Sequence, residues 1–357
     1  MIENRMTRRT FIQTSTTAVA AALSGNFIAR AADEPAMRKT RSYNPDMEYR
    51  RLGATGLWVS AIGLGGHWKR VNEVTGRNIP GVGIPKDVGD AEVLFQNRHD
   101  VVTRCLERGI NYVDACTADE VQAYGRALQG RRDKMYMSLD TWPRCPRKAE
   151  YCKAEELLKV LEDGLKLAKM DYADVWRLTA STAGKHTAAD EAEFIKAFEK
   201  AKKDGKVRFT GASSHDHPWL KHLAETYPQH FQVLLFPYTT KTKELPQDSL
   251  FDAIRKHDIG TFGIKPFAGG SLFTGTKDAK ERSDLARLTI RYILGNPAIT
   301  APIPGLASSQ EVDNIAAAIK ERRQLNKAEL SKIEHINEQM WARLPEHYQW
   351  LKNWEYV

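Results

Sequence analysis

The feature that most constrains the fold is a regular alternation of two apolar patterns between residues 47 and 318. Strand-like segments occupy residues 57–64, 112–114, 135–139, 174–178, 207–212, 233–236, 260–264 and 300–303. Helical patterns lie between them, among others at residues 93–107, 155–168, 191–203, 250–256, 284–294 and 309–321. Eight strands separated by helix-length segments predict an α/β fold, a (β/α)8 TIM barrel, rather than an open doubly wound sheet. In such a barrel the chemistry sits at the carboxyl ends of the strands.

The segment before the barrel has the pattern of an export signal. A twin-arginine motif runs from Thr7 to Ile12, a weakly apolar run covers residues 18–23, and the small residues Ala29 and Ala31 form a signal-peptidase site. Charged region, apolar region and cleavage site occur in the order that export signals use. We therefore expect residues 1–31 to be a twin-arginine signal peptide. The twin-arginine export machinery is then a partner, and the destination is periplasmic or otherwise outside the cytoplasm.

Composition narrows the function of the remaining chain. Residues 1–31 hold four arginines against Glu3, so the formal charge falls from +8 for 357 residues to +5 after their removal. The chain has no block of Lys and Arg dense enough to predict nucleic-acid binding. It also has no apolar run of the roughly 20 residues that span a bilayer. We expect a linker at residues 32–46, a barrel at 47–326, and a C-terminal helix with an aromatic tail at 327–357. A small molecule is the expected substrate.

Two segments outside the alternation are candidates for covering a site. Residues 67–90, rich in Gly, Pro and charge, form a long first β–α connection of the kind that often serves as a lid or binding loop. The tail after residue 327 carries Trp341, Tyr348, Trp350, Trp354 and Tyr356. Such aromatics either pack against the outer surface of the barrel or form a flap over its mouth, and the first interpretation is favoured because large aromatics mostly contribute buried area.

The four cysteines do not have the spacing of a zinc or iron–sulfur site. Cys145 and Cys152 are close enough in sequence to form a disulfide in an oxidising compartment, although two unpaired thiols fit the pattern equally well. Cys105 falls on the apolar face of a predicted helix, where a buried thiol is usual.

Several motifs together resemble the aldo/keto reductase family, in the order in which the family has them. They are EYRRLGATGLWVS at 48–60, IGLGG at 62–66, GINYVD at 109–114, GKVR at 205–208, GAS at 211–213, IKPFAGG at 264–270 and IPG at 303–305. The resemblance covers nearly the whole chain after the export signal. It implies a barrel and hydride transfer between NADP(H) and a carbonyl or alcohol.

The resemblance also implies an Asp, a Tyr, a Lys and a His that cooperate in proton transfer. Asp114 matches the Asp. The position expected for the Tyr carries Asp119, and Tyr124 aligns with a packing position of the following helix. The Lys falls on Asp140 and the His on Thr179, so the family's proton relay cannot operate in its usual form. Asp114, Asp140 and Thr179 are therefore the predicted catalytic positions.

The positions that the family uses for its nucleotide are altered as well. Ser213 is retained where the family holds the nicotinamide amide, whereas the adjacent Asn falls on Ser214 and the strand-six Gln on Leu235. Further candidates for cofactor binding, chosen because phosphates need cations and N–H donors, are Lys265, Gly305, Ser308 and Ser309.

Two other functions remain open. Asp114 and Asp140 at neighbouring strand ends could form a carboxylate pair that supplies an acid and a base, or a divalent metal could bind Asp, His and Cys side chains of the same rim. These rim residues are His67, Cys116, His215, Asp216 and His217, although we expect Asp216 to cap the helix that begins near Pro218.

The last alternative is a non-catalytic barrel that binds an organic ligand in an aromatic cleft. The aromatic candidates are Trp68, Trp142, Trp176 and Tyr238, of which Trp176 lies within a strand and is the most suited to the core. The predicted substrate pocket comprises His67, Trp68, Cys116, Trp142, His215 and Tyr238, and no residue is assigned to a metal.

Overall fold

The strands of the molecule form a closed parallel barrel in a computed structural model that describes residues 34–68, 70–76, 88–180, 186–276 and 278–354. The sheet has the order β3-β4-β5-β6-β7-β8-β9, with every neighbouring pair parallel. The strands are β3 (Tyr112–Thr117), β4 (Tyr136–Trp142), β5 (Ala173–Thr179), β6 (Val207–Ser213), β7 (Val233–Pro237), β8 (Gly260–Ile264) and β9 (Ala301–Pro302). Residues 63–65 close the barrel, because Leu64 bridges Val113 and Gly65 bridges Gly305. The predicted (β/α)8 barrel is confirmed.

The first predicted strand, residues 57–64, is wrong as a single element. Its beginning forms β2 (Trp58–Ser60), which pairs antiparallel with β1 (Tyr49–Arg51) in a hairpin outside the barrel sheet. The backbone then turns, because the Ser60 hydroxyl donates to the carbonyl of Ile62 and the Ser60 N–H donates to Asn111. Only the last residues of the segment enter the barrel.

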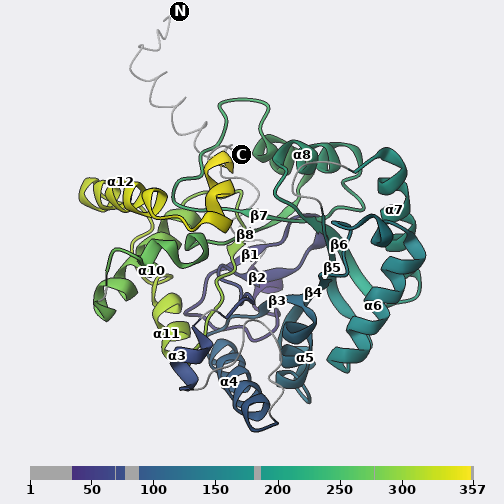
Figure 1. The fold of residues 1–357 in the computed structure, drawn as a ribbon, viewed down its shortest axis with the longest axis horizontal. Helices are drawn as coiled ribbons and strands as arrows, with labels where there is room; N and C mark the ends of the chain where they lie inside the picture. Colours follow the sequence, from purple (N-terminus) through teal and green to yellow (C-terminus); the bar gives the residue numbers. More distant parts are fainter. Residues whose placement is uncertain (1–33, 69, 77–87, 181–185, 277, 355–357) are drawn as a thin grey trace, which may run out of the picture.

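Helices surround the strands as an outer ring (Figure 1). They are α4 (Val88–Glu107), α5 (Ala118–Ala127), α6 (Ala154–Ala168), α7 (Ala188–Lys203), α8 (His217–Thr226), α9 (Leu250–His257), α10 (Ala279–Leu294) and α11 (Ser309–Ala317). Shorter helices are α2 (Glu34–Met37) and α3 (Val71–Thr75). Capping boxes begin α5, α7 and α9. In each, a Ser or Thr side chain and a Glu or Asp three residues later satisfy backbone N–H groups, which explains why the helices begin there.

Apolar side chains fill both the inside of the barrel and the layer beneath the helices. Tyr112 and Phe262 stack inside the barrel with ring centroids 4.0 Å apart. Trp176 points the other way and packs edge-on against Phe198 of α7, as expected for a core residue. The site therefore rests on a filled barrel rather than on an open channel.

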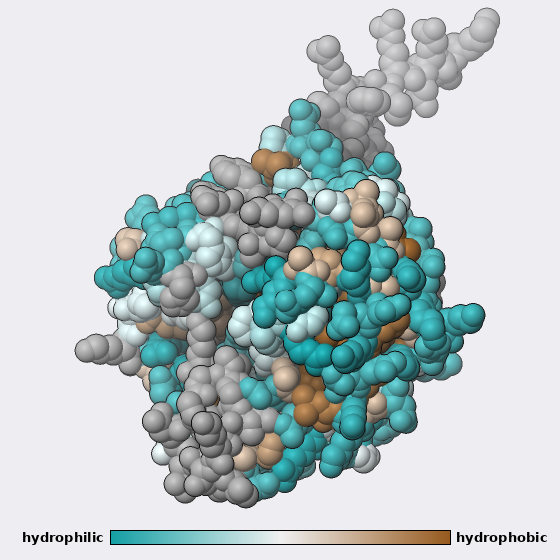
Figure 2. All heavy atoms as spheres, turned by 45° about the vertical axis from the view of Figure 1, so that its right-hand side comes forward, coloured by the Kyte–Doolittle hydropathy of each residue, from teal (hydrophilic) through white to brown (hydrophobic). Residues whose placement is uncertain are grey.

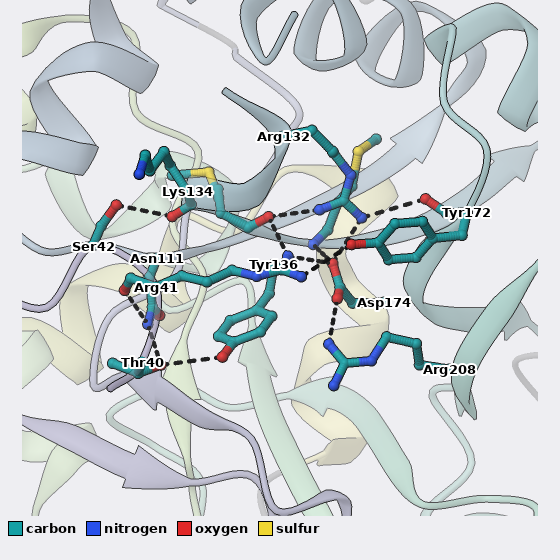
Figure 3. Close-up of polar contacts among 12 residues, drawn as sticks. Thr40, Arg41, Ser42, Asn111, Arg132, Lys134, Tyr136, Tyr172, Asp174 and Arg208 are labelled. Carbon is teal, nitrogen blue, oxygen red and sulfur yellow. Dashed lines mark hydrogen bonds and ion pairs between the residues drawn. The ribbon is translucent and has the colours of Figure 1, made fainter. Parts of the chain in front are cut away.

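One buried carboxylate binds three arginines at the amino-terminal end of the barrel (Figure 3). Asp174, fully buried at the start of β5, accepts from Arg41, Arg132 and Arg208 at 2.7 to 3.0 Å. Arg41 also lies over the Tyr136 ring, 4.4 Å from its centroid. These contacts bind the segment before β1, predicted as a linker, to the base of the barrel.

The C-terminal residues form α12 (Lys327–Ala342) and the 3-10 helix η6 (Glu346–Trp354). A small apolar cluster joins them to η5 (Ala268–Phe273), the turn that follows β8, through Leu272, Met340 and Leu351 among others. The tail thus packs at the carboxyl ends of the strands, and Tyr348 and Trp350 reach the cavity there. It forms a flap over the mouth, so the favoured prediction of packing on the outer surface is wrong.

The face of the molecule in Figure 2 is largely hydrophilic, with hydrophobic residues visible in small groups. Within the described parts of the chain, helices long and apolar enough to cross a membrane are absent. The predicted export signal at residues 1–31 lies outside the described residues, as does the 77–87 part of the predicted lid loop.

Candidate active site

A cavity of about 1020 Å³ opens at the carboxyl ends of the barrel strands. Its wall includes the ends of β3, β5, β6 and β8, the turn η5, parts of α10 and α11, and the C-terminal flap. Among the predicted site residues, the wall contains His67, Asp114, Cys116, Trp142, Thr179, Ser213, His215, Lys265 and Gly305.

A buried arginine occupies the centre of the predicted catalytic positions. Arg177 of β5 donates from Nε and Nη2 to the two carboxylate oxygens of Asp114, both at 2.7 Å. Its Nη1 donates to the Thr179 hydroxyl at 2.8 Å and lies 3.5 Å from Asp140. The Asp140 carboxylate in turn accepts from the Thr179 N–H at 3.2 Å. We call Asp114, Asp140, Arg177 and Thr179 the ion cluster.

Arg177 changes the predicted chemistry of the two carboxylates. Burial alone would lower the pKa of its guanidinium, but the charge of Asp114, a hydrogen bond to Asp114 and the charge of Asp140 raise this pKa well above its ordinary value. A cation therefore lies against both carboxylates, a contact that the hypothesis of a carboxylate pair supplying an acid and a base did not include. The group that faces the cavity is an Asp–Arg ion pair.

Sequence reasoning missed Arg177, although a signal was present. A charged residue inside an apolar strand is rarely buried without a partner, and residues 173, 175, 177 and 179 alternate on one face of β5. This alternation places Arg177 and Thr179 on the same side of the strand. Since Thr179 was already predicted at the site, Arg177 could have been predicted beside it, where it would pair with the carboxylates at the ends of the neighbouring strands.

A second buried carboxylate shapes the first β–α connection. Glu120 of α5 accepts the N–H groups of His67 and Cys116, at 2.6 and 2.7 Å, and lies 3.0 Å from His67 Nδ1. Burial would raise its pKa, but the bonds from His67 and the two backbone amides hold it below the ordinary value. Gly66 is required beside it, because a Cβ there would lie 2.0 Å from the carboxylate.

The cysteines do not form a reactive or metal-binding group in the described structure. Burial raises the pKa of the Cys116 thiol to about 12, so the thiol stays protonated at neutral pH. All four cysteines are free thiols, including Cys145 and Cys152. Among the described residues, no group of three or more His, Cys, Asp or Glu side chains is arranged so that it could hold a metal ion.

His215 and the flap meet above β6 and β8. The His215 ring stacks on Trp350 with centroids 4.0 Å apart and planes 22° apart, and its Nε2 lies 3.4 Å from Lys265 Nζ. Lys265 Nζ also lies 5.4 Å from the centroid of Trp350. Burial, with the charges of Lys265, Arg147 and His217, lowers the pKa of His215 far below its ordinary range. His215 is therefore neutral and can accept a hydrogen bond from Lys265.

The remaining predicted site residues have structural contacts and lie outside the cavity wall. Trp68 donates to Tyr124 at 2.7 Å and packs edge-on against it, and Tyr238 packs against Phe251. Ser214 accepts the N–H of Asp216. Asp216 caps α8 through the Trp219 N–H, as predicted, and His217 lies in the first turn of that helix.

Two serines of the predicted phosphate region lie at the start of α11. Ser308 is the N-cap, with its hydroxyl accepting the N–H of Glu311, and Ser309 is the first helical residue. Near them, Arg70 binds Glu73 and Glu311, at 2.9 and 2.5 Å. This ion pair connects the first β–α loop to α11 across one end of the cavity.

Comparisons with known proteins agree with this architecture. The profile of the aldo/keto reductase family matches residues 86–284. L-galactose dehydrogenase of Arabidopsis thaliana is 24% identical over 326 residues, which cover 82% of this chain and 95% of that protein. The uncharacterised oxidoreductase YqkF of Bacillus subtilis (strain 168) is 22% identical, covering 82% and 97%.

Solved structures resemble the chain at the level of the fold. An aldo-keto reductase from Klebsiella pneumoniae in complex with NADPH has a TM-score of 0.61 and 20% identity, covering 80% of this chain and 93% of that one. The holo form of an aldo-keto reductase from Bacillus halodurans has a TM-score of 0.58 and 22% identity, covering 85% and 99%.

Proposed function

Since this chain belongs to the aldo/keto reductase family, we propose that it is an oxidoreductase that uses NADP(H) to interconvert a carbonyl and an alcohol at the ion cluster. The observation that carries the proposal is the extent of the cavity. One continuous wall includes Asp114, Arg177 and Thr179 of β3 and β5 together with Arg282 of α10 and Asn314 of α11. The cavity can therefore hold an extended nucleotide next to a small substrate.

The residues of the wall fit a nicotinamide dinucleotide. Ser213 lies at the end of β6 beside the ion cluster and provides a hydroxyl for the nicotinamide amide. In η5, Gly270 lies on the wall with φ +98° and open space where a Cβ would be. The next residue, Ser271, is not on the wall, and its buried hydroxyl has no hydrogen-bond partner among the described residues. That turn can receive the diphosphate, and Arg282 supplies a cation for a further phosphate. When bound, the nucleotide supplies or accepts a hydride.

The ion cluster would bind and polarise the oxygen of the substrate. Arg177 keeps its positive charge, and Asp114 holds its guanidinium plane by two bonds. Thr179 accepts a bond from Arg177, which leaves its own hydroxyl proton for another acceptor. A cation and a hydroxyl in a fixed, largely dry position stabilise negative charge that develops on a substrate oxygen. This takes over the charge stabilisation that the resemblance assigns to the Tyr, Lys and His, and the proton that converts the alkoxide into the alcohol would come from solvent water.

The proposal includes export of the folded protein by the twin-arginine pathway. It is supported by the motif at Thr7 to Ile12 and the small residues at 29–31. Replacing Arg8 and Arg9 by lysine should retain the full-length precursor in the cytoplasm, as read by cell fractionation. Periplasmic product from the double variant would contradict the pathway.

The test of the enzymatic proposal is calorimetric titration of residues 32–357 with NADPH and NADH, followed by assay of carbonyl reduction through nucleotide absorbance. We expect binding at micromolar concentration and turnover of a subset of small carbonyl compounds. Arg177→Lys keeps the charge but loses the bidentate geometry, so its kcat should fall while the nucleotide Kd stays unchanged.

Two outcomes would contradict the proposal. A protein that binds neither nucleotide is not using the family's reaction. A protein that binds NADPH and shows no turnover with any carbonyl or alcohol is a receptor rather than an enzyme. Arg208→Lys at the opposite end of the barrel is the matched control, because it changes an arginine that also binds an aspartate but lies far from the cavity.

A further inference from the structure

We infer that the substrate carries a carboxylate, which binds at the mouth of the cavity between Arg147 and Lys265, beside His215 and Trp350. We call these four residues the carboxylate subsite. The inference rests on the proposed function for the reaction, and it adds the class of substrate: a small organic acid that also holds the reacting carbonyl or hydroxyl.

The charges of the cavity wall give the first argument. Five described wall residues are arginine or lysine and three are aspartate or glutamate. All three carboxylates are already bound: Asp114 by Arg177, and Glu73 and Glu311 by Arg70. Arg147 and Arg282 make no ion pair with a carboxylate among the described residues, and Lys265 Nζ lies 3.4 Å from His215 Nε2. When Asp140, 3.5 Å from Arg177, is counted with the wall, the five cations still exceed the four carboxylates, and a bound anion would balance the difference.

The positions of these cations divide them between two ligands. Arg282 lies on α10, beside the end of the cavity formed with α11, where the nucleotide phosphates are proposed. Arg147 lies at the other end, because its Nε donates to the carbonyl of Ala180, the residue that follows β5. In the sheet order, β5 is four strands away from β9. Arg147 is thus near the ion cluster and far from the proposed phosphate site.

The field at His215 supports the same location. Burial has the largest effect in lowering the pKa of His215, and the charges of Lys265, Arg147 and His217 lower it further. The positive charges of Arg147 and Lys265 therefore act at the same place in the cavity wall, next to the His215 ring. Arg147 donates from Nε to the Ala180 carbonyl at 3.0 Å, and among the described residues no carboxylate binds its two terminal nitrogens. A carboxylate is the group that a guanidinium binds best, through two parallel N–H bonds.

Aromatic side chains frame this end of the cavity. Trp350 covers His215, and Trp142 lies on the wall with 42% of its surface exposed. An indole beside a cationic group suits a ligand with one apolar face and one charged end. The carboxylate could belong to a sugar acid or to a short keto acid, and the test includes both.

The experiment compares substrates that differ only in the acidic group, using residues 32–357 with NADP(H). One pair is galacturonate and galactose, and the other is pyruvate and pyruvamide. We expect kcat/KM to favour the acid of at least one pair by about 10- to 100-fold, the range of a charge-assisted hydrogen bond. Preference within the first pair assigns a sugar acid, and preference within the second a keto acid.

Arg147→Gln should remove this preference by raising KM for the acid, with kcat and the NADPH Kd little changed. Arg144→Gln is the matched control: it lies three residues away, binds Asp163 on the surface and is outside the cavity wall. Equal kcat/KM for acid and neutral partner in the unaltered protein would overturn the inference, as would a preference that survives Arg147→Gln.

If the protein shows no turnover, the proposed function is contradicted, but the inference about the carboxylate subsite can still be tested. Calorimetry with galacturonate and pyruvate alone then decides. Binding that Arg147→Gln abolishes and Arg144→Gln leaves intact supports the carboxylate subsite. Acids that bind no better than their neutral partners overturn it.

Discussion

At the scale of single residues, the interior of the barrel depends on balancing one buried cation. Arg177 is 2% exposed, and Asp114 and Asp140 are 4% and 2% exposed. A buried charge that loses its partner is strongly destabilising, whereas the same loss at the surface has little effect. Arg177 therefore contributes to folding as well as to the proposed chemistry.

The first prediction follows from this balance. Arg177→Met should lower the free energy of unfolding by about 3–5 kcal/mol, because it leaves two carboxylates buried against an apolar side chain. Chemical denaturation monitored by circular dichroism measures the change. Arg208→Met, a partly exposed partner of Asp174 that leaves Arg41 and Arg132 in place, should change it by at most about 1 kcal/mol. Equal effects of the two substitutions would refute the balance argument.

The second prediction concerns pH. The pKa of His215 is lowered in the folded protein, so below about pH 6.5 the unfolded chain binds a proton that the folded chain does not. Stability therefore falls as the pH falls, by up to about 1.4 kcal/mol per pH unit from this residue. His215→Phe should keep the ring against Trp350 and make the decrease between pH 7 and 5 shallower. Parallel stability curves for the two proteins would show that His215 does not contribute.

At the scale of helices and strands, local sequence predicted most of the structure. The apolar patterns at 112–114, 207–212 and 260–264 all lie within strands, because parallel barrel strands are buried on both faces and read as continuous apolar runs. The prediction of one strand at 57–64 was wrong, because a continuous apolar run does not show where one strand ends and the next begins. The hairpin strand β2 ends at Ser60. That break is made by contacts of Ser60 with Asn111, 51 residues away.

The third prediction tests a helix start next to the site. Thr117 caps α5 and its partner Glu120 also binds the His67 N–H. Thr117→Ala should lower the free energy of unfolding by about 1 kcal/mol, the usual contribution of an N-cap. It should also loosen the loop at His67, as measured by faster amide hydrogen exchange there. Thr226→Ala, at the exposed end of α8, should change neither quantity. If amide hydrogen exchange at His67 is unchanged in Thr117→Ala, the cap of α5 does not stabilise the loop at His67.

At the scale of the whole molecule, the site combines parts that only tertiary structure brings together. Asp114, Thr179, Ser213 and Lys265 could be predicted on the cavity wall because strand ends meet on one face of a barrel. The contribution of Tyr348 and Trp350 could not, because an aromatic tail has the same composition whether it packs outside the barrel or over its mouth. Arg147 was missed since it lies in an irregular loop without a periodic pattern.

The fourth prediction concerns that flap. Ending the chain after Ala342 removes Leu344 and Leu351 from the cluster at η5 and exposes Leu272 and Met340. We expect a lower melting temperature and increased binding of a hydrophobic dye, because apolar area is returned to water. Affinity for an organic acid should fall with it, while an unaltered affinity would mean that the flap is not part of the ligand site. Leu330→Ala on the exposed face of α12 is the control for nonspecific loss of apolar surface.

The ion cluster also limits how such a site can be altered by mutation. Placing lysine at position 140 would set a second cation against Arg177. Replacing Arg177 first would instead leave Asp114 and Asp140 facing each other. Each single step passes through an unbalanced intermediate, so the two positions are epistatic and their effects will not add. A design that places a lysine at position 140 therefore has to exchange both charges at once, and a library of single substitutions would not find it.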